Sequence, residues 1–382
     1  MFFKSRNKCS IKFKLICSIA CLAVSAGLIL LAKSVSGFAE WYSASVYDSI
    51  VGIVGRITGI VPFSVVEILL YILIVYVIYR IMSLLLKKHT AAEFLASVVL
   101  ISSVLFLLYV VNCGIHYHRV SFAESSDLIL KEYTVDQLET VCTILTEDLN
   151  ECADLVERDE SGVMVHKSNL HDEVKAAMYK LSEDYPQLQG YYPQPKRLLF
   201  PWILSVQQIT GIYSPFTVEA NYNNALINYN IPFSACHELS HLRGYMQEEE
   251  ANFIAWLACT KSDNIDFQYS GTMRGWISCM NLLYRNDQER WKNIRLQLNE
   301  KVEADLTANS LFWDQYEGKI AEYAEKVNDT YLKANGQADG IKSYSRMADL
   351  IVAYYIQNQI RQTQTVLVKK GCVRTALLYY LR

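Results

Sequence analysis

The chain has 382 residues, a formal net charge of −3 at pH 7 and a hydrophobic content of 52%. This length is enough for a membrane anchor and one sizeable globular domain. The nearly balanced charge argues against a nucleic-acid-binding protein, so no nucleic acid is expected as a partner. The hydrophobic residues are concentrated in the first 113 positions, which predicts an anchor at the N-terminal end.

Three apolar runs of membrane-spanning length occupy this region, at about 13–35, 63–85 and 91–113. A helix needs about 20 apolar residues to cross a hydrocarbon core of about 30 Å. We therefore predict a membrane anchor over 1–115, with the lipid bilayer as a partner, followed by a separate domain over 116–382. The first run has the basic start of a cleaved signal peptide, but its long apolar core and the two later runs favour a span.

The Lys and Arg residues that flank the runs indicate an orientation. Basic residues precede the first run and lie between the second and third, at Lys4, Arg6, Lys12, Lys14, Arg80, Lys87 and Lys88. Between the first two runs, Arg56 is accompanied by Glu40 and Asp48. Because basic flanks face the cytoplasm, we predict a multi-pass protein of the cell membrane with an extracytoplasmic C-terminal domain.

Two ionisable residues, Glu67 and Arg80, fall within the second run. Each lies near one end of it, where a long side chain can reach the membrane–water interface. We interpret both as interface anchors. The alternative for Glu67 is a role in a path for substrate.

The pattern after residue 120 is mainly helical. Apolar residues have helical spacing over 136–155 and 171–185, whereas 191–201 contains three prolines and is expected to be extended or turning. Alternation predicts two short strands, at 215–223 and at 225–232, the second ended by Pro232. Helices are then expected over 233–243, 247–261, 271–285, 287–304, 311–333 and 345–368. The predicted fold class is mainly α, with a small sheet in an α+β domain.

Six of the ten cysteines lie beyond residue 116, and an even number in an extracytoplasmic domain allows disulfides. Cys142 and Cys152 are predicted to form a local bridge. Cys236 and Cys259 lie in apolar helical segments and are interpreted as small buried side chains. The absence of a CxxC pattern argues against a zinc site made of thiolates.

The helix expected over 233–243 contains the string His237-Glu238-x-x-His241 and stops at Gly244. Two histidines four positions apart lie on one face, so both imidazoles can bind a single ion. Zinc favours such nitrogen donors in four-coordinate geometry, which predicts a Zn²⁺ cofactor. Glu238 points beside the metal, where it can take a proton from a water whose pKa zinc lowers to about 7.

A third protein ligand is expected, because catalytic zinc sites have three of them and one open position. Glu248, Ala251, Asn252 and Ala255 share one face of the next helix, and the alanines allow a close approach to the metal helix. We therefore predict Glu248 as the ligand, with Glu250 as the fallback and otherwise as a supporting residue. Asn252 is predicted to hydrogen-bond a ligand histidine.

Beyond the motif, long segments resemble DUF3810, a bacterial family of uncharacterised, zincin-like membrane proteins. The similar segments are YYPQPKRLLF, ITGIYSPFTVEAN, CHELSHLRGYMQEEEANFIAWLAC, YSGTMRGWISCMNLLY and SYSRMADLIVAYY. The resemblance covers nearly the whole chain and implies a gluzincin-like metal site in a zincin-like domain. More distant zincins with a Glu-x-x-Ala-Asn helix use its first glutamate as ligand, and Glu248 stands at that position here.

By analogy with zincins, substrate backbone is expected to pair with a strand beside the metal helix. A tyrosine or arginine is expected to stabilise the oxyanion of the reaction. We predict Tyr344 and Arg346 in this role, with Arg243 and Tyr245 as alternatives. His116, His118, His166 and His171 lack metal-ligand context and are interpreted as surface or interface residues.

The main hypothesis is a membrane-anchored zinc metallopeptidase that hydrolyses a peptide or protein substrate, with Glu238 as general base. The alternative is a non-enzymatic membrane sensor or envelope assembly protein with a structural zinc site. Such a site has protein ligands at all four positions. Its fourth ligand would be Cys236 or a further histidine.

Overall fold

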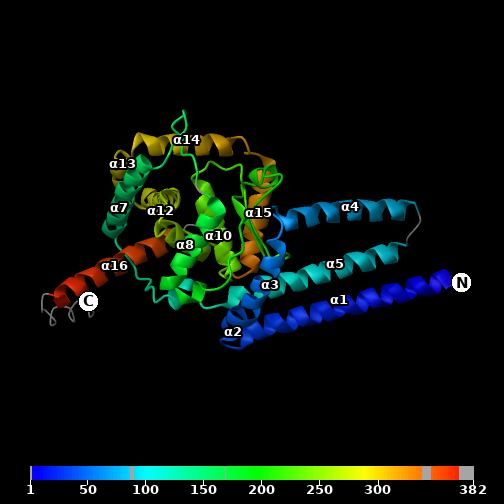
Figure 1. Cartoon of the computed structure of the whole chain (residues 1–382). Coiled ribbons are helices and arrows are strands. Elements are labelled where there is room, and N and C mark those ends of the chain that lie inside the picture. Colours follow the sequence, from blue (N-terminus) through cyan, green and yellow to red (C-terminus); the bar gives the residue numbers. More distant parts are fainter. Residues whose placement is uncertain (1, 87–89, 168, 338–345, 370–382) are drawn as a thin grey trace.

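The computed structural model describes all residues except 1, 87–89, 168, 338–345 and 370–382. Figure 1 shows a globular region of helices around a small sheet, with three long helices extending from one end of it. The described residues are mainly helical, which confirms the predicted fold class.

The three long helices are α1 (Phe2–Ser34), α4 (Val65–Leu85) and α5 (Ala91–Asn112). The part of α1 from Ser10 to Ser34, and the whole of α4 and α5, are long and apolar enough to cross a membrane. Side-chain caps explain where the later two begin. The Ser64 hydroxyl accepts the backbone N–H of Glu67, and Thr90 and Glu93 form a capping box. The predicted apolar helices are confirmed.

A compact helical segment joins α1 to α4. It consists of α2 (Phe38–Trp41), a π-helical turn (Tyr42–Tyr47) and α3 (Asp48–Thr58). This segment shares a hydrophobic core with the end of α5 and with the globular region, in which Tyr47, Val51, Val110, Tyr213 and Leu242 are buried. The long helices and the globular region are therefore joined by packing as well as by the chain.

Two buried carboxylates fix the start of α4 to the globular region. Glu219 accepts the backbone N–H groups of Val65 and Val66 at 3.2 and 3.0 Å, and it pairs with Lys196 at 2.5 Å. Glu67 accepts two backbone N–H groups from the loop after residue 197. Negative charge at a helix start is stabilising, because the first N–H groups lack helical partners. Glu67 is thus a link between α4 and the globular region.

The centre of the globular region is α12 (Ile265–Asn286). It packs against α7 (Val135–Leu155), α10 (Asn230–Leu242), α11 (Glu248–Thr260) and α16 (Met347–Lys369). The remaining helical elements of the described chain are a 3₁₀ turn (Gly114–His118), α6 (Phe122–Ser125), α8 (Leu170–Asp184), a 3₁₀ turn (Pro186–Leu188), α9 (Trp202–Ser205), α13 (Gln288–Arg295), α14 (Glu300–Asp314) and α15 (Lys319–Ala334).

Two of the predicted helices are wrong in their bounds. The predicted helix 287–304 is divided, because Asn299 caps a new helix by accepting the N–H of Lys301. The predicted helix 311–333 crosses the junction of α14 and α15. Gly318, with a φ of +146°, separates them there, in a conformation that a residue with a side chain rarely adopts.

The sheet has three short strands, β1 (Lys196–Arg197), β2 (Gly211–Ser214) and β3 (Glu219–Tyr222), in the order β1-β3-β2. β1 is parallel to β3 and β2 is antiparallel to it. The first predicted strand is confirmed only in its second half. The strand predicted at 225–232 is wrong, because the Asn223 side chain accepts the N–H of Ala225 and starts a turn that leads into α10.

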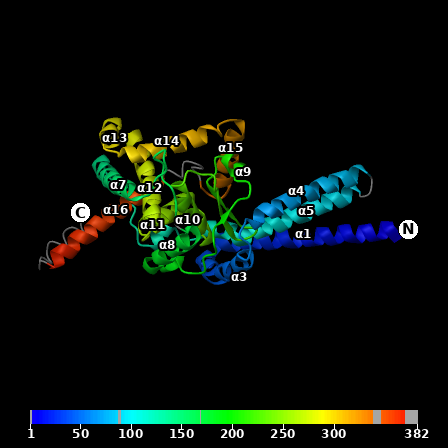
Figure 2. The ribbon, with the colours of Figure 1, turned by 45° about the horizontal axis from the view of Figure 1, so that its top comes forward.

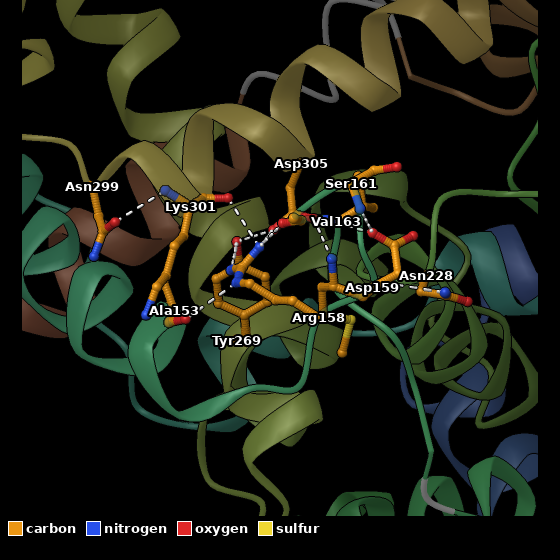
Figure 3. Close-up of polar contacts among 12 residues, drawn as sticks. Ala153, Arg158, Asp159, Ser161, Val163, Asn228, Tyr269, Asn299, Lys301 and Asp305 are labelled. Carbon is orange, nitrogen blue, oxygen red and sulfur yellow. Dashed lines mark hydrogen bonds and ion pairs between the residues drawn. The ribbon is translucent and has the colours of Figure 1, made fainter.

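A buried polar network lies where α14 packs on the rest of the globular region (Figure 3). The Asp305 carboxylate is fully buried and accepts hydrogen bonds from Arg158 at 2.8 Å, Tyr269 at 2.5 Å and the backbone N–H of Met164 at 2.7 Å. A buried carboxylate is tolerated only when it is paired and hydrogen-bonded. Asp305 therefore joins α14 to α12 and to the loop after α7.

The cysteines of the globular region that the structure describes, at positions 142, 152, 236, 259 and 279, are free thiols. The predicted Cys142–Cys152 bridge is wrong, because both residues lie on α7, where ten positions correspond to about 15 Å. Cys236 and Cys259 are buried, as predicted, and their sulfur atoms lie 3.7 Å apart.

Candidate metal centre

The His237-Glu238-x-x-His241 string lies on α10, inside the globular region. Pro232 occupies the first turn of this helix, where the missing N–H has no helical partner to lose. Gly244, with a φ of +83°, follows its end. The imidazole rings of His237 and His241 are one turn apart, with 4.6 Å between their centroids. Local sequence thus explains both the helix and the side-by-side histidines.

Glu248, the first residue of α11, brings a carboxylate to these rings. Its Oε2 lies 3.3 Å from Nε2 of His237, and its Oε1 lies 3.8 Å from Nε2 of His241. The buried Ala251 and Ala255 follow on α11, which packs closely on α10. Among the described residues, these three side chains form a group whose donor atoms all lie within 4.8 Å of one another.

This donor set fits a zinc ion. Tetrahedral bonds of about 2.1 Å place two ligand atoms about 3.4 Å apart, close to the spacing of these donors. Nδ1 of His241 lies 2.8 Å from the carbonyl oxygen of Tyr245. A proton on Nδ1 completes that hydrogen bond and leaves the lone pair on Nε2 free for a metal. Two imidazoles and one carboxylate leave one tetrahedral position for water or substrate.

The pKa values of the two histidines shift in opposite directions. Burial lowers the pKa of His237, but the hydrogen bond to Glu248 and the charges of Glu238 and Glu248 outweigh it, so the pKa is raised. Burial lowers the pKa of His241 to about 4, with the charge of Glu248 opposing. A metal ion would bind both imidazoles in their neutral form. Metal binding at such a site releases protons.

Glu238 is buried between the histidines and β2. A Cβ atom at Gly211 would come within 2.5 Å of its Oε1, so the glycine makes room for the carboxylate. The backbone N–H of Tyr213 donates a hydrogen bond to Glu238, and the charges of His237 and Glu248 both act on it. Burial raises the pKa of Glu238 to about 8, which the hydrogen bond and the charge of His237 oppose.

Asn252 lies next to His237, as the helical wheel predicts. It is buried one turn beyond Glu248, and its hydrogen bonding helps to raise the pKa of His237. Glu250 points elsewhere. Its Oε1 accepts the backbone N–H of Phe122 at 2.7 Å, and burial raises its pKa to about 8. The geometry therefore favours Glu248 over Glu250 as the third donor.

Of the residues predicted to stabilise an oxyanion, Tyr344 lies outside the described residues. Arg346 borders the metal ligands, because its Nη1 lies 3.6 Å from Oε1 of Glu249, the neighbour of Glu248. Gln337 also donates to Glu249, at 2.8 Å. Gln337 and Arg346 thus both lie beside the start of α11.

The two alternatives for this role face another part of the molecule. Nη1 of Arg243 donates to Asp48 at 2.8 Å, and the buried guanidinium thereby links the end of α10 to α3. The Tyr245 ring is covered by the guanidinium of Arg119, 4.4 Å from the ring centroid. Arg243 therefore joins the globular region to α3, and Tyr245 joins it to the loop after α5.

Sequence reasoning missed Gly211 and Gln337 as parts of this site. A glycine within a strand often indicates that another group approaches the backbone closely, and this signal could have identified Gly211. For Gln337 the sequence carries no such signal, because its contact with Glu249 joins residues 88 positions apart.

Comparison with known proteins gives one match. The family model of DUF3810, described as a protein of unknown function, matches residues 42–352. No curated protein and no solved structure matches the chain. The matched range begins at the π-helical turn before α3 and includes α4, α5, the sheet and every residue of the candidate metal centre that the structure describes.

Proposed function

This chain belongs to the DUF3810 family, whose function is unknown, and we propose that it is a membrane-anchored zinc metallopeptidase. One observation carries the proposal: His237, His241 and Glu248 converge from two helices, with the carboxylate of Glu238 buried beside them. Three protein donors, an open position and an adjacent general base are the parts of a catalytic zinc site.

Zinc bound by these donors would supply a water of lowered pKa and would polarise the carbonyl of a substrate. Glu238 accepts a proton from the attacking water and delivers it to the leaving amine. The hydrogen bond between His241 and the Tyr245 carbonyl keeps Nε2 available as a donor. β2 lies at one edge of the sheet, so an extended peptide has a strand to pair with beside Glu238.

The alternative, a sensor or assembly protein with a structural zinc site, needs a fourth protein ligand. Cys236, the candidate for that position, contacts Cys259 instead, with 3.7 Å between the sulfur atoms. The group of donors formed by the described residues has three members. This composition supports a catalytic site over a structural one.

We also propose that α1, α4 and α5 cross the membrane. The basic flanks then place the globular region, with its metal centre, outside the cytoplasm. A reporter fused to the C-terminus should be active only outside the cytoplasm. A reporter that is active only in the cytoplasm would show the opposite orientation and contradict this proposal.

The test of hydrolysis compares the full chain with Glu238→Gln, both purified in detergent. Zinc is measured by elemental analysis, and cleavage by mass spectrometry of a defined peptide library. We expect both proteins to bind about one zinc, while the variant loses at least about 100-fold in cleavage rate, as for removal of a general base. Glu183→Gln, on the exposed side of α8, is the control for the substitution itself.

Two results would refute the proposal. One is a wild-type protein that binds no zinc. The other is a Glu238→Gln protein that cleaves the library as fast as the wild type.

A further inference from the structure

Two helices near the long apolar helices, α3 and α15, are amphipathic and have exposed apolar residues. On α3, Val51, Gly52 and Gly55 face the interior, whereas Ile53 and Ile57 are more than three-fifths exposed. Ile60, just beyond the helix, is 80% exposed. A helix that buries one side and leaves isoleucines on the other lacks a partner for that side within the described chain.

α15 also has exposed apolar residues, and the residue that it buries is Leu332. Ile320, Tyr323 and Val327 are exposed at helical spacing, and Tyr323 is 70% exposed. The contacts of α15 with the long helices are at its C-terminal end. There the Tyr331 hydroxyl meets that of Tyr117 at 3.2 Å, and Asn335 accepts a hydrogen bond from Tyr109 of α5. This end of α15 is therefore level with the end of α5.

A third exposed apolar group lies in the loop after β1. Phe200 and Trp202 are both 60% exposed. Their position relative to α4 is fixed, because the N–H groups of Leu199 and Phe200 donate to Glu67 at 2.7 and 2.9 Å.

The contact of Phe200 with Tyr71 shows where Phe200 lies along α4. The two rings meet edge to face, with 5.9 Å between their centroids. Tyr71 is six residues beyond Val65, the first residue of α4, which corresponds to about 9 Å along the helix. Phe200 therefore lies beside the first two turns of α4.

Figures 1 and 2 place α3 and α15 at one end of the globular region, the end from which the long helices extend, and Figure 2 places α9 there as well. α13 lies at the opposite end in both views. In Figure 1, α3 and α15 run across the direction of the long helices, as helices lying in a membrane surface would. Three segments that are distant in sequence and carry exposed apolar side chains thus lie at the same end of the globular region.

We propose that the globular region rests on the membrane through this surface, which we call the apolar rim: the exposed sides of α3 and α15 and the loop 199–202. Its occupant is the lipid bilayer. The rim is continuous with the outer ends of α4 and α5, and Phe200 is held beside α4 by backbone hydrogen bonds. Amphipathic helices in a membrane surface bury their apolar side about 5–10 Å into the boundary between headgroups and acyl chains. Tryptophan, as at position 202, is typical of that boundary.

This inference rests on the proposed membrane crossing and does not depend on hydrolysis. A rim embedded in lipid holds the globular region at a fixed height and orientation. The metal centre then lies no farther from the bilayer than the globular region is thick. Its substrates would be segments of polypeptide that come close to the membrane surface.

The test uses the full chain in nanodiscs of phosphatidylcholine whose acyl chains either carry or lack bromine, a short-range quencher. A fluorescent amino acid replaces Ile57, Phe200 or Tyr323, one position at a time. We expect each to lose about half or more of its fluorescence in the brominated discs, since the rim reaches the acyl chains. Leu296 is the matched control, because it is 75% exposed and follows α13 at the far end. It should keep its fluorescence.

Ile74, exposed on α4, reports the membrane crossing itself. Quenching at Ile74 without quenching at positions 57, 200 and 323 would overturn the rim while leaving the crossing intact. No quenching at Ile74 would overturn the crossing and the rim together. Rim positions that resist quenching but cross-link to a second copy of the chain would assign this surface to a dimer and overturn the proposal.

Discussion

Nε2 of His237 lies 3.3 Å from Oε2 of Glu248, although the two residues belong to separate helices. This contact distinguishes Glu248 from the two glutamates that follow it, because Glu249 turns to Gln337 and Arg346 and Glu250 binds the N–H of Phe122. Each of the three consecutive glutamates thus contacts a different set of residues.

The first prediction follows from this division. Glu248→Gln removes a charged donor from the candidate metal centre, and we expect zinc affinity to fall by more than the 10–100-fold typical of residues that only support ligands. Glu250→Gln should bind zinc as the wild type does. Competition with a zinc chelator measures both. The reverse result would make Glu250 the third ligand.

Gly211→Ala should impair Glu238 without removing the metal. The new Cβ would come within 2.5 Å of Oε1 of Glu238 and within 2.9 Å of the Asn221 carbonyl oxygen, so the carboxylate or the strand has to shift. We expect a lower cleavage rate with unchanged zinc content, and a loss of about 1–3 kcal/mol in stability. Gly27→Ala, with nothing within 4 Å of its new Cβ, is the control. A rate equal to the wild type would show that this contact is unimportant.

Asp305→Ala should destabilise the globular region by about 3–5 kcal/mol, because Arg158 then keeps a buried charge without its partner. Asp314→Ala changes an exposed carboxylate on the same helix and should have little effect. Thermal unfolding in detergent measures both. Equal midpoints for the two variants would contradict the structural role of the network in Figure 3.

His116 should make stability depend on pH. The sequence predicts a surface or interface residue at this position, which is wrong, because His116 is fully buried beside Ser43, with 4.1 Å between its ring centroid and that of Tyr47. Burial, together with the charges of Arg119 and Arg243, lowers its pKa well below the usual value. The unfolded chain therefore takes up a proton first as the pH falls.

This difference in proton uptake determines how the free energy of unfolding changes with pH. Above about pH 6.5 the imidazole is neutral in both the folded and the unfolded chain, so it does not change the free energy of unfolding. Below that pH the free energy of unfolding falls by up to about 1.4 kcal/mol per pH unit, until the pKa of His116 in the folded chain is reached. His116→Gln should show a shallower loss between pH 7.5 and 5.5 in chemical denaturation. Equal slopes for wild type and variant would contradict this assignment.

Features that depend on neighbouring residues could be predicted from the sequence. The three apolar helices follow from the length of their apolar runs, and α10 follows from Pro232, Gly244 and helical spacing. The side-by-side histidines follow from a separation of four residues, because the pitch of a helix fixes which side chains share a face.

Features that depend on contacts between distant segments were decided only by the tertiary structure. The wheel argument indicated Glu248, but the distances to His237 and His241 come from the packing of α11 on α10. The break between α13 and α14 and the failure of the second predicted strand depend on side-chain caps at Asn299 and Asn223, which compete with regular backbone pairing. The sequence alone thus determined which residues can bind a metal and which helices can enter a membrane. The fold determined that Glu219 and Glu67 hold the globular region to α4, because those contacts join residues more than 130 positions apart.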